Sequence, residues 1–201
     1  MRIFSLFRFL TPLAISCLYL QAEESALPDM VENVSLSVRD LNGEDRMPFR
    51  MSGEKAAVLL FVTQDCPISN AYAPEYARLK NEYDPKGFKL TLVYVDPDVS
   101  DERIREHMSD FSLSAYQAIA DREHRLVEEL GATVTPEAVV VLPDGTIAYR
   151  GRIDNMYPAL GQRRRVITEK DLRNALDSIG DGRAVYVSRT RAVGCYVPNL
   201  P

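Results

Sequence analysis

The residue best placed to do chemistry is Cys66, which lies between an apolar run and a helical pattern. The run 57–62 is apolar throughout, and a run of this length and kind predicts a strand buried on both faces. Pro67 suits the first helical position, because its fixed φ fits and its missing N–H needs no partner there. Cys66 is therefore predicted at a helix N-terminus, where free N–H groups and the helix dipole stabilise a thiolate. The alternative is a small buried core cysteine, the usual fate of a free Cys.

The first 22 residues have the pattern of a secretory signal peptide. Arg2 and Arg8 form a basic start, and residues 9–20 carry no charge. This apolar segment is too short for a comfortable membrane span, and we expect cleavage after Ala22. The sequence thus predicts an exported protein, in the bacterial periplasm or outside the cell, with no membrane span after the signal peptide is removed.

Export makes the cysteine content informative. Cys17 leaves with the signal peptide, so the mature chain keeps Cys66 and Cys195. Two cysteines in an oxidising compartment invite a disulfide, although their separation in sequence does not say whether they meet. A redox pair, a static disulfide and an intermolecular link all stay open.

Composition argues against several classes of partner and cofactor. The chain of 201 residues carries a net charge of −5, which disfavours nucleic acid and anionic membranes as partners. Its two histidines exclude a multi-histidine metal site. The acidic segment 96–102 is better explained as the capped start of a helix than as a calcium site. We expect no organic cofactor and no bound metal.

The pattern of elements predicts one α/β domain between two extensions. Strands are expected at 34–38, 47–51, 57–62, 88–95, 118–120, 137–142 and 146–150, and helices at 67–83, after Ser100, at 122–130 and at 168–179. Pro74 should kink the first helix, and Thr168 with Asp171 forms a partial capping box. Strands that alternate with helices and end in a hairpin predict a mixed sheet with helices on both faces. The expected segments are a signal peptide (1–22), a flexible segment (23–33), the domain (34–179) and a tail with Cys195 (180–201).

These residues resemble thioredoxin-fold redoxins, the group that includes peroxiredoxins of the AhpC/TSA type and exported thioredoxin-like proteins. The stretch 61–69 lies where the family has its strand, active-site cysteine and helix, and Pro74 matches its helix-kinking proline. Val134, Thr135 and Pro136 resemble the cis-proline turn that faces the active site. The resemblance covers about 34–179 and implies a three-layer sandwich, in which this turn presents backbone to an incoming peptide or disulfide.

The active-site motif departs from each subfamily. Thioredoxins have Cys-x-x-Cys, whereas Ser69 takes the second position here, so Cys66 lacks a local resolving partner. Peroxiredoxins have Pro-x-x-x-Thr-x-x-Cys and a distant Arg. Thr63 and Cys66 fit that spacing, Leu59 replaces the proline, and Arg150 is a candidate for the arginine.

A closer resemblance is to exported bacterial redoxins, which share four short motifs with this chain. They are Cys-Pro-Ile-Ser-Asn (66–70), Thr-Pro-Glu (135–137), Tyr-Arg-Gly-Arg-Ile-Asp (149–154) and Gly-Cys (194–195). The resemblance implies that Cys195, on a mobile tail, is the thiol that resolves the oxidised form of Cys66. A remote resolving cysteine would permit a full redox cycle without Cys-x-x-Cys.

The sequence therefore predicts an exported thiol-dependent oxidoreductase. The Cys66 thiolate would attack a peroxide or a disulfide sulfur, and Cys195 or an external thiol would resolve the product. The expected partners are a protein or small-molecule disulfide or thiol, or a peroxide, together with an external thiol as electron donor. The supporting residues are Thr63, Pro67, Ser69, Thr135, Pro136 and Arg150.

Two alternatives belong to other functional classes. One is a Cu(I) carrier that uses Cys66, Cys195 and a histidine; Asn70 stands where copper proteins of this fold have their second Cys. The other is a non-catalytic module in which a Cys66–Cys195 disulfide merely holds the tail.

Other polar residues receive plainer predictions. His107 and His124 are expected as solvated surface residues, and Arg163–Arg165 as a solvated charge run, with a partner contact as the minority hypothesis. Thr63 is expected to bond the thiolate. Tyr149 and Tyr157 are expected to pack rather than to catalyse.

Overall fold

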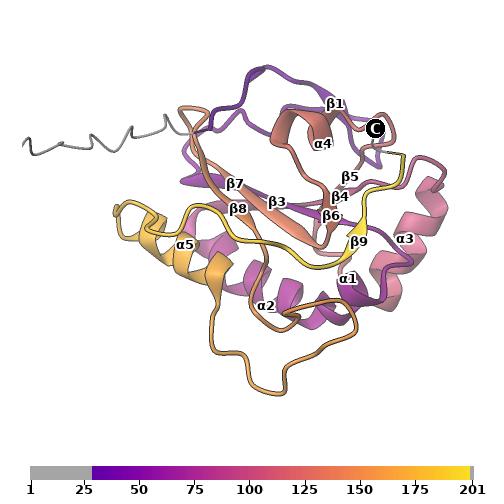
Figure 1. Cartoon of the computed structure of the whole chain (residues 1–201). Helices are drawn as coiled ribbons and strands as arrows, with labels where there is room; N and C mark the ends of the chain where they lie inside the picture. Colours follow the sequence, from indigo (N-terminus) through magenta and orange to yellow (C-terminus); the bar gives the residue numbers. More distant parts are fainter. Residues whose placement is uncertain (1–28, 200–201) are drawn as a thin grey trace, which may run out of the picture.

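A buried strand, β3, forms the middle of a five-stranded sheet in the computed structural model, which describes residues 29–199 (Figure 1). All residues of β3 are buried, as its apolar run predicts. The strands lie in the order β5-β4-β3-β7-β8, with β3, β4 and β5 parallel and with β7 antiparallel to both β3 and β8. Their bounds are Ala56–Val62 (β3), Phe88–Tyr94 (β4), Gln117–Ala120 (β5), Glu137–Val141 (β7) and Ile147–Gly151 (β8).

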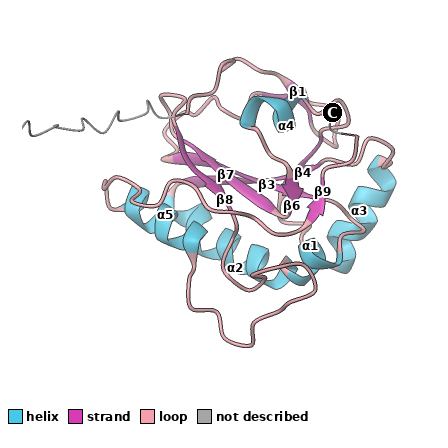
Figure 2. Cartoon of the chain, in the orientation of Figure 1, coloured by secondary structure: helices cyan, strands magenta, loops and turns pink. Residues whose placement is uncertain are grey.

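Helices cover both faces of this sheet (Figure 2). Side chains alternate along β3, so that Leu60 belongs to one hydrophobic core and Leu59 to the other. Helices α2, α3 and α5 pack into the first core, and α4 packs into the second with the segment that precedes β3. The predicted three-layer sandwich with a mixed sheet is confirmed. The helix bounds are Ala73–Tyr83 (α2), Asp101–Asp110 (α3), Arg125–Leu130 (α4) and Asp171–Gly180 (α5), with a 3-10 turn at Asp84–Lys86.

The N-terminal hairpin is shorter than predicted. It consists of β1 (Val38–Arg39) and β2 (Asp45–Arg46). The strand predicted at 34–38 is therefore realised only at Val38, and the one predicted at 47–51 is wrong, since β2 ends before Met47. The Asp40 carboxylate accepts two backbone N–H groups of the turn, at 2.8 and 3.0 Å. These bonds close the turn immediately after β1.

The segment before the hairpin is packed rather than flexible. The N–H of Val31 donates to the carbonyl oxygen of Gly145 at 2.9 Å, and the Val31 side chain is part of a core. The prediction of a flexible segment at 23–33 is therefore wrong for residues 29–33. The predicted signal peptide, 1–22, lies outside the described residues. Within 29–199, every helix is too short or too polar to cross a membrane.

The helix predicted at 67–83 is interrupted. It forms α1 (Pro67–Ala71) and then α2, with Tyr72 between them and Pro74 in the first turn of α2. A proline in a first turn costs no backbone hydrogen bond, since that N–H would have no helical partner. The expected kink is realised as a break between two helices.

Two other helices begin later than predicted. Helix α4 begins at Arg125 instead of 122, because the Asp121 carboxylate accepts the N–H groups of Leu126 and Val127 and caps the helix from outside. Helix α5 begins at Asp171, since the Thr168 hydroxyl bonds the Asn155 side chain and does not cap the helix. The Ser100 cap of α3 is confirmed by its bond from the N–H of Arg103.

The tail returns to the sheet and lies along its edge. The N–H of Arg150 on β8 donates to Ser188 O at 2.9 Å, and the N–H of Thr190 donates to Arg150 O at 3.1 Å. Further on, β9 (Cys195–Tyr196) pairs antiparallel with β6 (Val134–Thr135). The tail with Cys195 is therefore ordered, contrary to the mobile tail that the resemblance implied.

A glycine on β8 makes this close approach possible. A Cβ added to Gly151 would lie 2.2 Å from Thr190 Oγ1 and 2.4 Å from Thr190 O. The Thr190 hydroxyl accepts the N–H of Arg152 at 3.0 Å and bonds the Tyr149 hydroxyl at 2.7 Å. One threonine thus anchors the tail to the edge of the sheet.

Thr190→Val tests this anchor, because it keeps the shape of the side chain and removes the hydroxyl. We expect the free energy of unfolding to fall by about 1–3 kcal/mol, the usual result of leaving a buried polar group without its partner. Urea unfolding measures it. Thr133→Val, at an exposed threonine, is the matched control and should change stability by less than about 0.5 kcal/mol. Equal losses in the two variants would contradict the anchor.

Candidate active site

Cys66 lies at the N-terminus of α1, as predicted. Its backbone is extended, it is the N-cap residue, and Pro67 follows in the first turn. Its sulfur accepts the N–H of Ser69 at 3.4 Å, and its thiol donates to the carbonyl oxygen of Thr135 at 3.2 Å. The side chain is 1% exposed. The N–H of Ser69 stabilises negative charge on this sulfur.

The turn that faces Cys66 has the predicted cis peptide bond, between Thr135 and Pro136. Thr135 is fully buried, and its hydroxyl bonds the hydroxyl of Thr63 at 3.1 Å. Thr63 therefore supports the turn, and its hydrogen bond goes to Thr135 instead of the expected thiol. The carbonyl of Thr135 is held in place beside the sulfur of Cys66.

Cys195 lies against the same turn. In the β6–β9 ladder Cys195 is paired with Thr135, and the two cysteines are free thiols. A Cβ on Gly194 would lie 2.0 Å from Thr135 O and 2.5 Å from its carbon. Only glycine lets the tail lie this close, so Gly194 places Cys195 against the turn that Cys66 contacts.

The two thiols lie in different electrostatic environments. Burial, a hydrogen bond with Cys66 and the charges of Cys66 and Asp65 raise the pKa of Cys195 to about 12. Cys195 is therefore protonated at neutral pH, while Cys66 has an N–H directed at its sulfur. This difference favours Cys66 as the nucleophile.

A buried chain of hydrogen bonds supports the loop before Cys66. The Tyr94 hydroxyl bonds His107 Nδ1, His107 Nε2 bonds Asn70 Oδ1, each at 2.9 Å, and Asn70 Nδ2 donates to Gln64 O at 2.9 Å. Asn70 Oδ1 only accepts, so His107 donates from Nε2 and accepts from Tyr94 at Nδ1. The chain connects β4 and α3 with the loop that leads to the cysteine.

Both histidines are buried, so their prediction as solvated surface residues is wrong. Each is 8% exposed. His124 Nε2 bonds Val95 O at 2.8 Å, and His107 is held as described above. The set of two cysteines and a histidine that the copper alternative requires is not assembled. Within residues 29–199, no three His, Cys, Asp or Glu side chains are grouped as metal ligands.

Arg150 is directed away from the thiols. Its guanidinium donates to Leu130 O at 2.7 Å and pairs with Asp29 at 3.5 Å. The side chain thus packs by α4, on the face of the sheet opposite α2. The geometry does not bring together a threonine, a cysteine and an arginine as the peroxiredoxin pattern requires.

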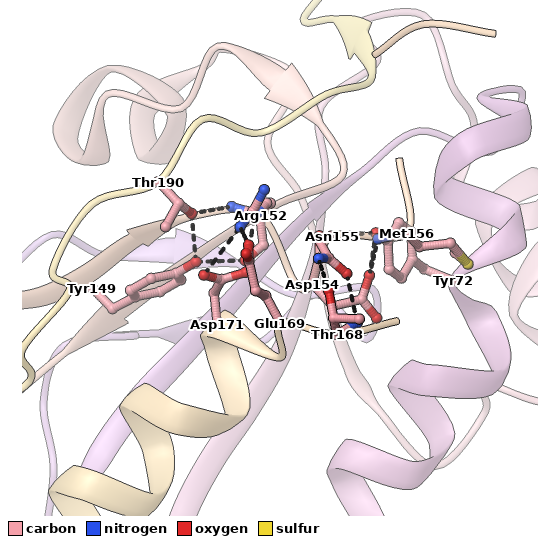
Figure 3. A network of polar contacts seen from close by, with 10 residues as sticks. All are labelled: Tyr72, Tyr149, Arg152, Asp154, Asn155, Met156, Thr168, Glu169, Asp171 and Thr190. Atoms are coloured by element: carbon pink, nitrogen blue, oxygen red, sulfur yellow. Dashed lines mark hydrogen bonds and ion pairs between the residues drawn. The ribbon is translucent and has the colours of Figure 1, made fainter. Parts of the chain in front are cut away.

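The motif 149–154 connects the tail with the end of α1 (Figure 3). Tyr149 and Arg152 hold Thr190 of the tail, as described for the fold. The Asp154 carboxylate accepts the Tyr72 hydroxyl at 2.7 Å, directly after α1. Burial raises the pKa of Asp154 and, with the bond to Asp154, that of Tyr72. Tyr149 is fully buried, as its predicted packing role requires.

Sequence reasoning missed several residues that build this site. They are Asn70, His107, Tyr94, Tyr72, Asp154, Thr190 and Gly194. Asn70 and Gly194 were visible as members of short motifs beside the two cysteines. The contact between Tyr94 and His107 joins separate elements, and no local pattern indicates it.

Comparison with known proteins gives a family match. The model of the AhpC/TSA family matches residues 28–150, which is more than half of the chain. A search of curated protein sequences finds no match.

Solved structures show the same fold. An uncharacterised conserved protein from Geobacillus kaustophilus has a TM-score of 0.75 at 22% identity, over 87% of this chain and 93% of its own. A hypothetical protein from Sinorhizobium meliloti 1021 has a TM-score of 0.71 at 19% identity, over 85% and 93%. DsbF from MTB, solved in mixed oxidised and reduced forms, has a TM-score of 0.56 at 18% identity, over 73% and 96%.

The variant Gly194→Ala tests the close contact between the tail and the Thr135 turn. The added Cβ meets the Thr135 carbonyl, so β9 must move away from the turn. We therefore expect alkylation of Cys66 by iodoacetamide to become about tenfold faster. This corresponds to a free energy of opening of the tail that is lower by about 1.4 kcal/mol. Peptide mapping by mass spectrometry measures the rate for Cys66 alone. Gly180→Ala is the control, since its Cβ would meet Phe88 at an ordinary 3.9 Å. An unchanged rate would mean that the tail does not cover Cys66 in solution.

The variant His107→Gln tests the buried chain of hydrogen bonds through the pH dependence of stability. Desolvation lowers the pKa of His107 below its ordinary 6.5. As the pH falls through about 6.5, the unfolded state binds a proton that the folded state does not, so the native protein loses stability. The stability advantage of the native protein over His107→Gln should therefore shrink between about pH 7.5 and pH 5.5 in urea unfolding. A constant difference would contradict a neutral His107.

Proposed function

The chain belongs to the AhpC/TSA family and has a thioredoxin-like fold, and we propose that it is an exported thiol-dependent oxidoreductase. Cys66 is its nucleophile and Cys195 its resolving thiol. The observation that carries this proposal is the position of both cysteines at one residue, Thr135. Cys66 donates to Thr135 O, and Cys195 is paired with Thr135 in the β6–β9 ladder.

The first chemical step is attack by the Cys66 thiolate. The sulfur attacks either the terminal oxygen of a peroxide or a sulfur of a disulfide, and the leaving group takes the bonding electron pair. The product is a sulfenic acid or a mixed disulfide at Cys66. The N–H of Ser69 supports the thiolate before the attack.

The second step is resolution by Cys195. Its sulfur attacks the sulfur of Cys66, loses its proton, and expels water or the substrate thiol, which leaves a Cys66–Cys195 disulfide. Both cysteines lie at Thr135 before this step, since Cys66 donates to its carbonyl and Cys195 is its partner in the β6–β9 ladder. An external thiol then reduces the disulfide. This route replaces the Cys-x-x-Cys pair that Ser69 precludes.

Export agrees with a disulfide cycle, since disulfides persist in the periplasm and outside the cell. The basic and apolar pattern of residues 1–22 supports this location. The substrate is a peroxide or a thiol–disulfide compound, with an external thiol as electron donor.

Cysteine variants test the cycle. After stoichiometric hydrogen peroxide or oxidised glutathione, the native protein should form a Cys66–Cys195 disulfide that about 1 mM dithiothreitol opens within minutes. Cys195→Ser should stop at a sulfenic acid or mixed disulfide on Cys66, and Cys66→Ser should lose turnover by about a hundredfold or more. Alkylation followed by peptide mass spectrometry identifies each species.

Two results would contradict the proposal. Native turnover rates in Cys66→Ser would remove the nucleophile from the mechanism. A Cys66–Cys195 disulfide that resists dithiothreitol would instead favour a structural link that holds the tail.

A further inference from the structure

Two exposed segments, one of which contains Cys195, carry side chains that the proposed chemistry does not use. They are the loop 156–168, between β8 and α5, and the tail segment 186–196; together we name them the loop–tail surface. Most large exposed hydrophobic side chains of the described chain lie here, namely Leu160, Val166, Ile167, Tyr186, Val187 and Tyr196. Exposed apolar groups concentrated in two segments of a chain are typical of an interaction surface.

The loop is held firmly at its base. The Asn155 amide nitrogen donates to the Thr168 hydroxyl at 2.7 Å, and Asn155 Oδ1 accepts the N–H of Thr168 at 3.1 Å (Figure 3). Asn155 is 2% exposed. Above this pair, the N–H of Arg164 donates to Met156 O at 2.8 Å. A loop closed in this way presents its tip in a defined position.

The surface is locally positive in a chain whose net charge is −5. Arg163, Arg164 and Arg165 are exposed, and with Arg191 they form no ion pair within residues 29–199. Many arginines elsewhere are paired with carboxylates; Arg173, for example, pairs with two glutamates. Uncompensated guanidinium groups attract carboxylates and steer acidic partners toward the surface.

A groove lies between the two segments, next to the strand that carries Cys195. It has a volume of about 630 Å³, with Pro158–Leu160 on one side and the tail residues 189–194 on the other. Gly194 and Tyr196 line it, and Cys195 lies between them. Cys195 is partly exposed whereas Cys66 is buried. A donor therefore reaches the sulfur of Cys195 before that of Cys66.

We propose that the loop–tail surface docks the electron donor, and that this donor is a protein or peptide whose thiols are flanked by acidic and apolar side chains. The proposal rests on the proposed function, because it assigns the partner that reduces the Cys66–Cys195 disulfide. Charge complementarity selects an acidic donor, and the exposed apolar groups supply the contact area.

The electrons balance with a donor that has two thiols. A donor thiolate attacks Cys195 Sγ, forms a bond to it and breaks the Cys66–Cys195 bond, whose electron pair leaves with Cys66 as a thiolate. The second donor thiolate attacks the donor's own sulfur in the mixed disulfide. Cys195 leaves, takes a proton and becomes a thiol. The donor ends as a disulfide, and the protein has gained two electrons.

Charged dithiol peptides test the proposal. Three peptides share one sequence with two cysteines and differ only in three flanking residues, which are all Glu, all Gln or all Lys. The rate at which each reduces the oxidised protein is divided by its rate with a small neutral disulfide, which corrects for thiol pKa. We expect the Glu peptide to react about tenfold faster than the Lys peptide at low salt, and the difference to disappear at about 0.5 M NaCl.

Two triple variants identify the surface. In R163Q/R164Q/R165Q the Glu-to-Lys rate ratio should fall close to one. The control R39Q/R78Q/R103Q removes the same charge from exposed arginines elsewhere and should keep the ratio. The proposal is overturned by equal ratios in the two variants, or by binding of the native protein to anionic phospholipid vesicles without any preference among the peptides.

Neutral dithiothreitol separates this proposal from the proposed function. If it reduces the disulfide at one rate in all variants while the peptides show no charge preference, the redox cycle stands and the docking surface is wrong. If no Cys66–Cys195 disulfide forms, the proposed function itself fails.

Discussion

One backbone carbonyl, that of Thr135, organises the site. It accepts the thiol of Cys66, it lies against Gly194 of the tail, and the hydroxyl of Thr63 fixes the residue that carries it. A displaced carbonyl would separate the two sulfurs, because each is positioned by reference to this turn. The Cys-x-x-Cys motif achieves such proximity within one helical turn. Here strand pairing between distant parts of the chain achieves it.

Buried polar groups give this arrangement its rigidity. The C-terminal end of helix α1 is supported twice, by Asn70 bonded to His107 and by Tyr72 bonded to Asp154. Each of these bonds is short and most of the groups are shielded from water, where an unpaired group would be costly. Alternative positions of α1 would leave several such groups without partners. The cysteine therefore sits on a helix that has little freedom to shift.

The sequence was sufficient for the parts of the fold that local patterns encode. The apolar run of β3 and the proline after Cys66 each predict their own structure over a few residues, whereas the Thr-Pro turn was predicted from the family resemblance. The tail was beyond such patterns, because the two-residue strand β9 has no periodicity and its pairing with β6 depends on a glycine's fit to a distant carbonyl. The burial of His107 likewise depends on α3 packing against β4.

The closure between Asn155 and Thr168 has an evolutionary consequence. Because the loop is fastened below its tip, the residues at the tip support no part of the hydrophobic core. Substitutions, insertions or a transplanted sequence at the tip therefore cost the domain little stability. The surface can diversify while the sulfur chemistry stays the same, so related chains can acquire new partner specificities by exchanging this one surface loop.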